Sequence, residues 1–334
     1  MKLPKLDDER ELTRILERQK KLAFDIERSI DWKGGIDLDR YFLPLDPDAV
    51  AFPDADAAER RVLSQYLGLV IAQTFAEMET ALVAAKDLVW KKNLQLYPIN
   101  PEFEALGEQF FTEEEKHSRM FKRYLDVFAA QTGVTPEELH SILPKVDGSV
   151  LLGGLKLNSK YGGQALWWVL TLVEECSVLM FKQMKPFEGR LDPLYFAIHK
   201  AHFEEEVRHS SYSYWMLEHL YTRNRSVIAT VFRKTDLLLA QGLEIAWAIN
   251  ALARIRHARR LKDKHPFFAG LVRLIPLLRK QTPFQMIQKL FLSAPFISLL
   301  LNPNHHGDYQ TMATKLHALE FPVPNPRKLQ LSAP

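Results

Sequence analysis

Two stretches of the chain combine glutamate and histidine at helical spacing, and these are side chains that bind metal ions. Residues 202–209 read HFEEEVRH, which places His202, Glu206 and His209 at positions i, i+4 and i+7. On an α-helix these three side chains lie along one stripe. Two neutral nitrogen donors and one anionic oxygen donor suit a first-row transition metal. The stretch predicts a metal-binding helix, with His199 one turn earlier at the surface or supporting the ligands.

The second stretch, residues 110–117, repeats half of this pattern. It reads FFTEEEKH and contains Glu114-x-x-His117, just as the later stretch contains Glu206-x-x-His209. One Glu-x-x-His on a helix is usually a surface ion pair. Two copies, each preceded by an apolar helix that carries a carboxylate, are the ligand set of a carboxylate-bridged di-iron bundle. The repetition therefore favours a two-metal site.

The two preceding carboxylates come from apolar segments that each offer two neighbouring candidates. These are Glu77 and Glu79 in the first segment, and Glu174 and Glu175 in the second. Aligning Glu79 with Glu175 also places Lys86 on Lys182, each seven residues downstream. This internal repeat favours Glu79 and Glu175, and it leaves Glu77 and Glu174 open as alternatives.

A two-metal site of this composition would serve dioxygen chemistry. Two ferrous ions held about 3.5–4 Å apart can jointly deliver the two electrons that O₂ activation requires. The expected ligands are the bridges Glu114 and Glu206, the pair Glu79 and His117 on one iron, and the trio Glu175, His202 and His209 on the other. Four carboxylates neutralise two Fe²⁺ ions, which makes their burial feasible. The ligand types do not distinguish iron from manganese.

Four long helical segments would position these ligands. They span residues 57–92, 102–131, 164–184 and 193–221, and strand-like alternation of any length is absent from the sequence. Glycines between residues 148 and 163 mark a long crossover between the second and third segments. One long crossover is typical of the ferritin-like arrangement. We therefore predict an all-α protein with a ferritin-like four-helix bundle core and additional N- and C-terminal helices.

The chain divides into three predicted regions. Residues 1–56 form an N-terminal helix and loop on the bundle, residues 57–221 the di-iron bundle, and residues 222–334 a basic helical extension of the same domain. Residues 223–334 hold 17 Lys/Arg against 5 Asp/Glu, whereas residues 1–222 carry a balance of −9. A chain of 334 residues, 47% of them hydrophobic, can bury a large core.

Composition also bears on the compartment. Cys176 is the only cysteine, which excludes an intramolecular disulfide and fits a reducing environment. The first residues lack the apolar segment of a signal peptide. The longest uninterrupted apolar run, residues 165–173, is too short for a membrane span. We therefore expect a cytoplasmic protein.

His202 makes the two stretches unequal, because Phe110 occupies the equivalent position in the first. A seventh protein ligand is unusual among ferritin-like oxygenases, and this set resembles the p-aminobenzoate N-oxygenase family. The matching residues are Glu79, Glu114, His117, a glutamate at 174 or 175, His202, Glu206 and His209. The resemblance covers residues 57–221 and implies a di-iron monooxygenase that uses O₂ to convert aryl-amines to hydroxylamino or nitro compounds. It also implies electrons from a separate reductase.

Other functions remain open at this point. The same ligands suit a di-iron hydroxylase or desaturase acting on a C–H substrate. A ferritin-type iron-handling protein is disfavoured, since a storage cage needs neither the C-terminal extension nor a third histidine. A membrane-surface or scaffold protein would use the basic, apolar residues 267–301.

Several partners are expected alongside a small-molecule substrate. The positive C-terminal field favours an external electron donor, such as an acidic ferredoxin or a reductase. A membrane surface competes for the same region, because Phe267, Phe268 and Leu271 interleave with Arg273 and Arg279. A homodimer is a further expectation, and no nucleic-acid partner is predicted.

Overall fold

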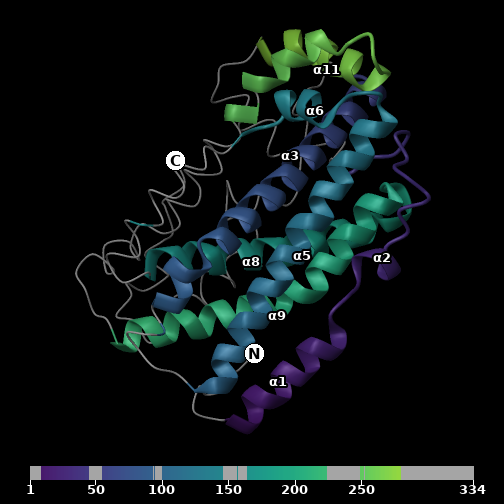
Figure 1. Cartoon of the computed structure of the whole chain (residues 1–334). Helices are drawn as coiled ribbons and strands as arrows, with labels where there is room; N and C mark the ends of the chain where they lie inside the picture. Colours follow the sequence, from purple (N-terminus) through teal and green to yellow (C-terminus); the bar gives the residue numbers. More distant parts are fainter. Residues whose placement is uncertain are drawn as a thin grey trace, which may run out of the picture.

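Four long helices form the centre of the protein. The computed structural model describes residues 9–44, 55–92, 94, 100–145, 156, 164–223, 249–251 and 253–279. The long helices are α3 (Ala57–Ala84), α5 (Pro101–Gln131), α8 (Gln164–Met184) and α9 (Pro193–Arg223). Helix α3 packs along α5, α8 packs along α9, and α5 also contacts α9 (Figure 1). The predicted all-α bundle is confirmed, and the described residues contain no β-strand.

Local capping signals explain where several helices begin. Asn100 caps α5, accepting a hydrogen bond from the backbone N–H of Phe103, and Pro101 occupies the first helical position. Thr135 and Glu138 form a capping box at the start of α6 (Pro136–Ile142). These caps supply acceptors to amide groups that the helix itself leaves unpaired.

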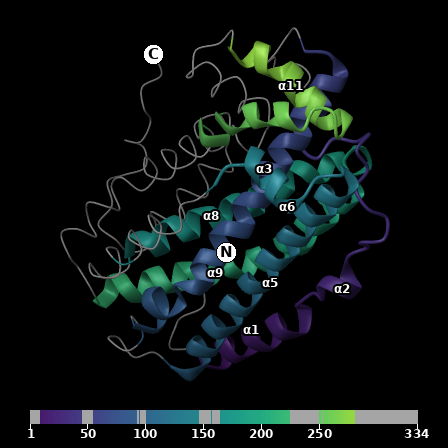
Figure 2. The same ribbon diagram turned by 45° about the horizontal axis from the view of Figure 1, so that its top comes forward.

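The single N-terminal helix predicted within residues 1–56 is interrupted. Helix α1 (Glu9–Leu22) ends before a short link, and α2 (Ile26–Ser29) begins after it. The carboxylate of Asp25 accepts hydrogen bonds from the backbone N–H groups of Glu27 and Arg28. An aspartate that bonds to the backbone in this way favours a cap over a continuous helix. Helix α1 lies against α5 (Figure 2).

The helix expected to reach residue 92 also changes character. Regular α3 ends at Ala84, and the chain continues as the π-helix η1 (Asp87–Lys91). Trp90 of this segment is fully buried and donates a hydrogen bond to the Tyr212 hydroxyl of α9 at 2.7 Å. Gly107 of α5 permits this contact, because a Cβ atom there would overlap both side chains. The π-helical turn thus holds α9 close to α5.

The core consists of two clusters of buried apolar side chains with a polar layer between them. One cluster includes Phe121 and Phe128 of α5, and the other includes Phe110 of the same helix. Glu114 and His117 lie between these positions and are also buried. The predicted ligands of α5 therefore occupy a polar layer enclosed by apolar packing on both sides.

Helix α3 is by length and composition apolar enough to cross a membrane. Half of its most apolar window is buried inside the protein, and the helix packs against α5 and α11. Gln73, Glu77 and Glu79 interrupt its apolar sequence. Its packing is that of a core helix in the bundle.

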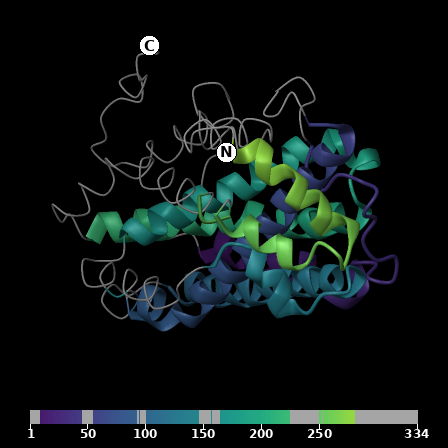
Figure 3. The ribbon, with the colours of Figure 1, turned by 90° about the horizontal axis from the view of Figure 1, so that it is seen from above.

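The described part of the C-terminal region covers one end of the bundle. It comprises the 3₁₀-helix η3 (Ile255–Arg260) and α11 (Pro266–Arg279), which lies in front of the long helices when viewed from above (Figure 3). Phe267, Phe268 and Leu271 are buried, and the Phe267 ring packs on Phe128 at 5.0 Å. These apolar side chains face the core, so they do not form the membrane-binding face considered from the sequence. Residues 224–248 and 280–334 lie outside the described part of the chain.

We expect Asp192→Ala to lower the free energy of unfolding by about 2 kcal/mol. The buried Asp192 carboxylate accepts one hydrogen bond from the Tyr195 N–H, which caps α9, and another from the Asp37 N–H, both at 2.7 Å. Chemical denaturation measures the loss. The exposed Asp39→Ala is the control and should change stability by less than about 0.5 kcal/mol. Equal stability of the two variants would contradict the proposed capping role.

Candidate metal centre

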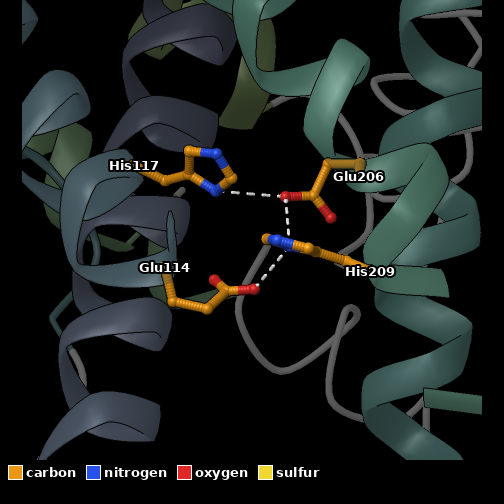
Figure 4. A group of neighbouring side chains, drawn as sticks. All are labelled: Glu114, His117, Glu206 and His209. Carbon is orange, nitrogen blue, oxygen red and sulfur yellow. Dashed lines mark ion pairs between the residues drawn. The ribbon is translucent and has the colours of Figure 1, made fainter. Parts of the chain in front are cut away.

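Helices α5 and α9 bring the two Glu-x-x-His units face to face. His117 Nδ1 lies 3.2 Å from Glu206 Oε1, and His209 Nδ1 lies 2.9 Å from Glu114 Oε1 (Figure 4). His209 Nδ1 is also 3.4 Å from Glu206 Oε1. All four side chains are buried, and each offers one ligand atom within 4.8 Å of those of the others. The four thus converge on one small volume.

Glu79 of α3 and His202 of α9 extend this group. His202 Nε2 lies 3.2 Å from Glu79 Oε1 and 2.9 Å from Glu206 Oε1. Glu79, His117 and His202 form a second set of converging ligand atoms, again within 4.8 Å of one another. The structure therefore places His202 beside Glu79 and His117, whereas the sequence-based grouping assigned it to the other iron.

The glutamates of α8 occupy a different position. Glu174 and Glu175 are both buried. Neither belongs to the two sets of converging ligand atoms found in the described residues. Burial raises the pKa of the Tyr214 phenol, and the neighbouring Glu175 raises it further. A ligand from α8 remains a prediction.

Of the two candidates on α3, Glu79 is the one that points into the centre. Glu77 is only half-buried and accepts a hydrogen bond from the Gln73 side chain. Burial raises the pKa of Glu79 well above its usual value, and repulsion from Glu114 and Glu206 adds to the rise. The Glu79 carboxylate thus lies close to two other carboxylates in the buried centre.

The histidines of the centre differ in their proton affinity. Burial by itself would lower the pKa of His209, but Glu206 and Glu114 outweigh burial and raise it well above the usual value. Burial also opposes protonation of His117, yet contacts with Glu205 and Glu206 raise its pKa. For His202, burial and the neighbouring histidines together lower the pKa well below the usual value. His202 is therefore neutral, as a metal ligand must be.

Several polar atoms of the centre lack the hydrogen bonds that buried groups normally make. The atoms are Glu79 Oε2, Glu114 Oε1, Glu206 Oε2, His117 Nδ1 and His209 Nδ1. The two Nδ1 atoms approach carboxylate oxygens without pointing at them in hydrogen-bond geometry. An unpartnered buried polar group costs about 1–3 kcal/mol. Divalent cations would partner these atoms, and their oxygen and imidazole donors fit first-row metals.

Sequence reasoning missed two glutamates that support the histidines. Glu205 Oε2 lies 2.7 Å from His117 Nε2, and Glu113 Oε2 lies 2.9 Å from His209 Nε2. Each stands immediately before a predicted bridging glutamate, so both stretches read Glu-Glu-x-x-His. The two consecutive glutamates in each stretch were the feature of the sequence that could have indicated these contacts.

His199 is fully buried, so the expectation that it could lie at the surface is wrong. Its ring packs on Tyr195 at 4.3 Å and on Phe121 at 5.2 Å. Neither ring nitrogen has a hydrogen-bond partner among the described residues. Burial lowers the pKa of His199 to about 3, so the side chain is neutral.

Metal uptake by this centre should weaken as pH falls. His117 and His209 have raised pKa values, so each holds a proton that an incoming metal must displace. The affinity of the centre for metal has its full value above these pKa values and decreases as the pH falls through them. Titration with Co²⁺ between about pH 6 and pH 8 should show tighter binding at the higher pH, with proton release detected by an indicator dye. Binding without pH dependence or proton release would contradict this expectation.

One comparison with known proteins identifies a family for the chain. The family profile of P-aminobenzoate N-oxygenase AurF matches residues 5–265 of the chain. The match extends beyond the four long helices to α1, η3 and the connecting segments. Neither the curated proteins nor the solved structures returned a significant match.

Proposed function

Because the chain belongs to the p-aminobenzoate N-oxygenase family, we propose that it is a non-haem di-iron oxygenase that uses O₂ to oxidise the nitrogen of an aryl-amine. The observation that carries this proposal is the convergence of both Glu-x-x-His units with Glu79 and His202 in one buried layer. The two sets of ligand atoms adjoin each other, and Glu206 Oε1 of one set lies 2.9 Å from His202 Nε2 of the other, so a carboxylate stands where it could serve two adjacent metals.

The side chains of the centre have distinct tasks in this proposal. Glu206 holds a central position, because its Oε1 lies near the coordinating nitrogens of His117, His202 and His209. Glu114 faces the same volume from α5 and would share the bridging role. Two ferrous ions bound there would supply the electrons for activation of O₂.

Aromatic rings control access to the histidines. Phe75 packs on His202 with ring centroids 4.7 Å apart, and Phe121 packs on it at 5.1 Å. Phe110 packs on His209 at 4.6 Å. These rings keep water from the imidazoles, and a dry site limits side reactions of a reactive oxidant.

The experiment that tests the function is a turnover assay with labelled dioxygen. Protein loaded anaerobically with Fe²⁺ would be mixed with ¹⁸O₂ in the presence of a chemical reductant and a panel of aryl-amines that includes p-aminobenzoate. We expect hydroxylamino or nitro products that carry the label on nitrogen, detected by mass spectrometry. Label on carbon instead would identify a C–H hydroxylase. Oxygen consumption without any labelled organic product would refute the oxygenase proposal.

The reducing partner is proposed to dock on the basic end of the bundle. Arg256, Arg259 and Arg260 of η3 are exposed, and none of them forms an ion pair within the described part of the chain. Lys264 differs, because its ammonium group pairs with Glu138 at 2.6 Å. Three unpaired guanidinium groups would attract an acidic electron donor of the ferredoxin class.

Charge reversal of these three arginines to glutamate should slow reduction of the metal centre by such a donor. The wild-type rate should fall with ionic strength, because salt screens exposed charges. Stopped-flow reduction with a ferredoxin measures both effects, and dithionite serves as the control because it needs no docking surface. A rate that is insensitive to the reversal and to salt would exclude this surface.

A further inference from the structure

The two glutamates that precede the bridging positions form a second repeat around the centre. Glu113 and Glu205 are buried, although neither belongs to the converging ligand atoms. Both stretches share the pattern Glu-Glu-x-basic-His, with Lys116 before one histidine and Arg208 before the other. Burying a charged side chain is costly, so its repetition in both Glu-x-x-His stretches indicates that it has a role in each.

The contacts of this repeat cross from one half to the other. Glu205 of α9 lies 2.7 Å from Nε2 of His117 on α5. Glu113 of α5 lies 2.9 Å from Nε2 of His209 on α9. In both histidines the opposite nitrogen, Nδ1, faces the converging glutamates. An Nε2–H that donates to a carboxylate fixes the tautomer and leaves the Nδ1 lone pair for a metal.

The N-terminal segment holds both glutamates in place. The Gln19 side chain of α1 is buried and donates a hydrogen bond to Glu113 Oε2 at 2.8 Å. The backbone N–H of Phe24 donates to Glu205 Oε1 at 3.1 Å. The Phe24 ring stacks on His117 with centroids 6.0 Å apart. Residues outside the four-helix bundle thus complete the support of the two histidines.

The charges of Glu113 and Glu205 are balanced by neighbouring side chains, without a metal. Lys116 Nζ lies 2.6 Å from Glu205 Oε1. The Arg208 guanidinium lies 3.5 Å from Glu113 Oε1 and 3.7 Å from Glu205 Oε1. Two cations thus offset two anions, so these carboxylates remain ionised as acceptors for the imidazole N–H groups. The carboxylates among the converging ligand atoms, Glu79, Glu114 and Glu206, would then offset the charge of the bound metals.

We propose that Glu113 and Glu205 are positioning residues, each of which orients the imidazole of the opposite Glu-x-x-His unit, and that Gln19 and Phe24 extend this support to the N-terminal segment. The inference deepens the proposed function and rests on metal binding by the histidines. It also predicts an order of effects, because Gln19 contacts Glu113 and therefore acts on His209 rather than on His117.

Anaerobic Co²⁺ titration of the full chain tests the proposal. Glu113→Leu and Glu205→Leu should each lower the affinity of one of two Co²⁺ equivalents by about 10–100-fold and should shift the visible absorption of the bound ion. Glu113→Gln and Glu205→Gln retain an acceptor oxygen, so they should recover most of the affinity. Gln19→Leu should weaken the same equivalent as the Glu113 variants, by a smaller factor.

Matched controls lie beside each position. Glu115 and Glu204 are exposed neighbours on the same helices, and their Gln variants should bind both equivalents like the wild type. If a Leu variant fails to fold, as judged by circular dichroism, the corresponding Ala variant, which also lacks the acceptor oxygen, and Gln19→Leu decide the question. Wild-type affinity and absorption in the folded Leu or Ala variants would overturn this inference and leave the proposed function standing. A wild-type chain that takes up no metal would overturn the proposed function and this inference with it.

Discussion

Replacement of Glu206 by alanine is expected to abolish metal-dependent oxygenation. Glu206 Oε1 lies 2.9 Å from His202 Nε2, 3.2 Å from His117 Nδ1 and 3.4 Å from His209 Nδ1, so one oxygen serves three histidines. Loss of a residue that only supports a ligand typically costs 10–100-fold in metal affinity. Loss of the shared ligand itself should exceed about 100-fold and affect both equivalents.

Two measurements establish this result. Metal content after anaerobic loading with Fe²⁺ should fall below that of the wild type, and the yield of labelled product should fall to the level of the metal-free protein. The exposed Glu204→Ala on the same helix is the matched control and should retain both. Because alanine leaves three buried histidines without their shared carboxylate, Glu206→Gln provides a second variant of nearly the same volume. Full metal content and turnover in both Glu206 variants would rule out the central role.

Removal of the metals is expected to produce the second large effect, a marked loss of thermal stability. The metal-free centre holds unpartnered buried atoms on Glu79, Glu114, Glu206, His117 and His209. A ligand present at a thousandfold excess over its dissociation constant stabilises the folded state by about 4 kcal/mol per site. Two tightly bound ions should therefore raise the melting temperature by well over the change produced by a typical point mutation.

Anaerobic thermal unfolding with increasing Fe²⁺ measures this effect, and a chelator should reverse it. The melting temperature should continue to rise until two equivalents per chain have been added, and elemental analysis should then give two iron atoms. Glu206→Ala is the control that should lose most of the metal-dependent increase. Saturation at one equivalent would refute a two-metal centre, and an unchanged melting temperature would refute metal binding at this position.

Most of the fold and the principal ligand candidates could be predicted from local patterns. The Glu114-x-x-His117 and Glu206-x-x-His209 spacings define stripes on single helices, and such stripes depend only on helical periodicity. The caps at the starts of α6 and α9 are equally local features, because a cap involves neighbours within one turn. The predicted third helix, residues 164–184, has the same bounds as α8.

Local patterns failed where a side chain from another element decided the outcome. The link between α1 and α2 bonds to two other helices, because the Phe24 N–H donates to Glu205 of α9 and the Lys116 ammonium group of α5 donates to the Phe24 carbonyl oxygen. The apolar residues of α11 looked suited to a membrane, but α3, η3 and the Phe128 ring of α5 cover them. A hydrophobic stripe indicates that a face is buried without indicating what buries it.

The same distinction separates the two levels of the metal centre. Spacing along each helix determined which glutamates and histidines share a face, and it selected the ligand candidates on α5 and α9. Only the tertiary structure decided that Glu79 lies beside His202, that His117 and His209 present Nδ1, and that Glu113 and Glu205 support the opposite halves. The reason is geometric. Periodicity sets directions around one helix axis, whereas contacts between helices depend on the rotation and axial register that packing of the whole core imposes.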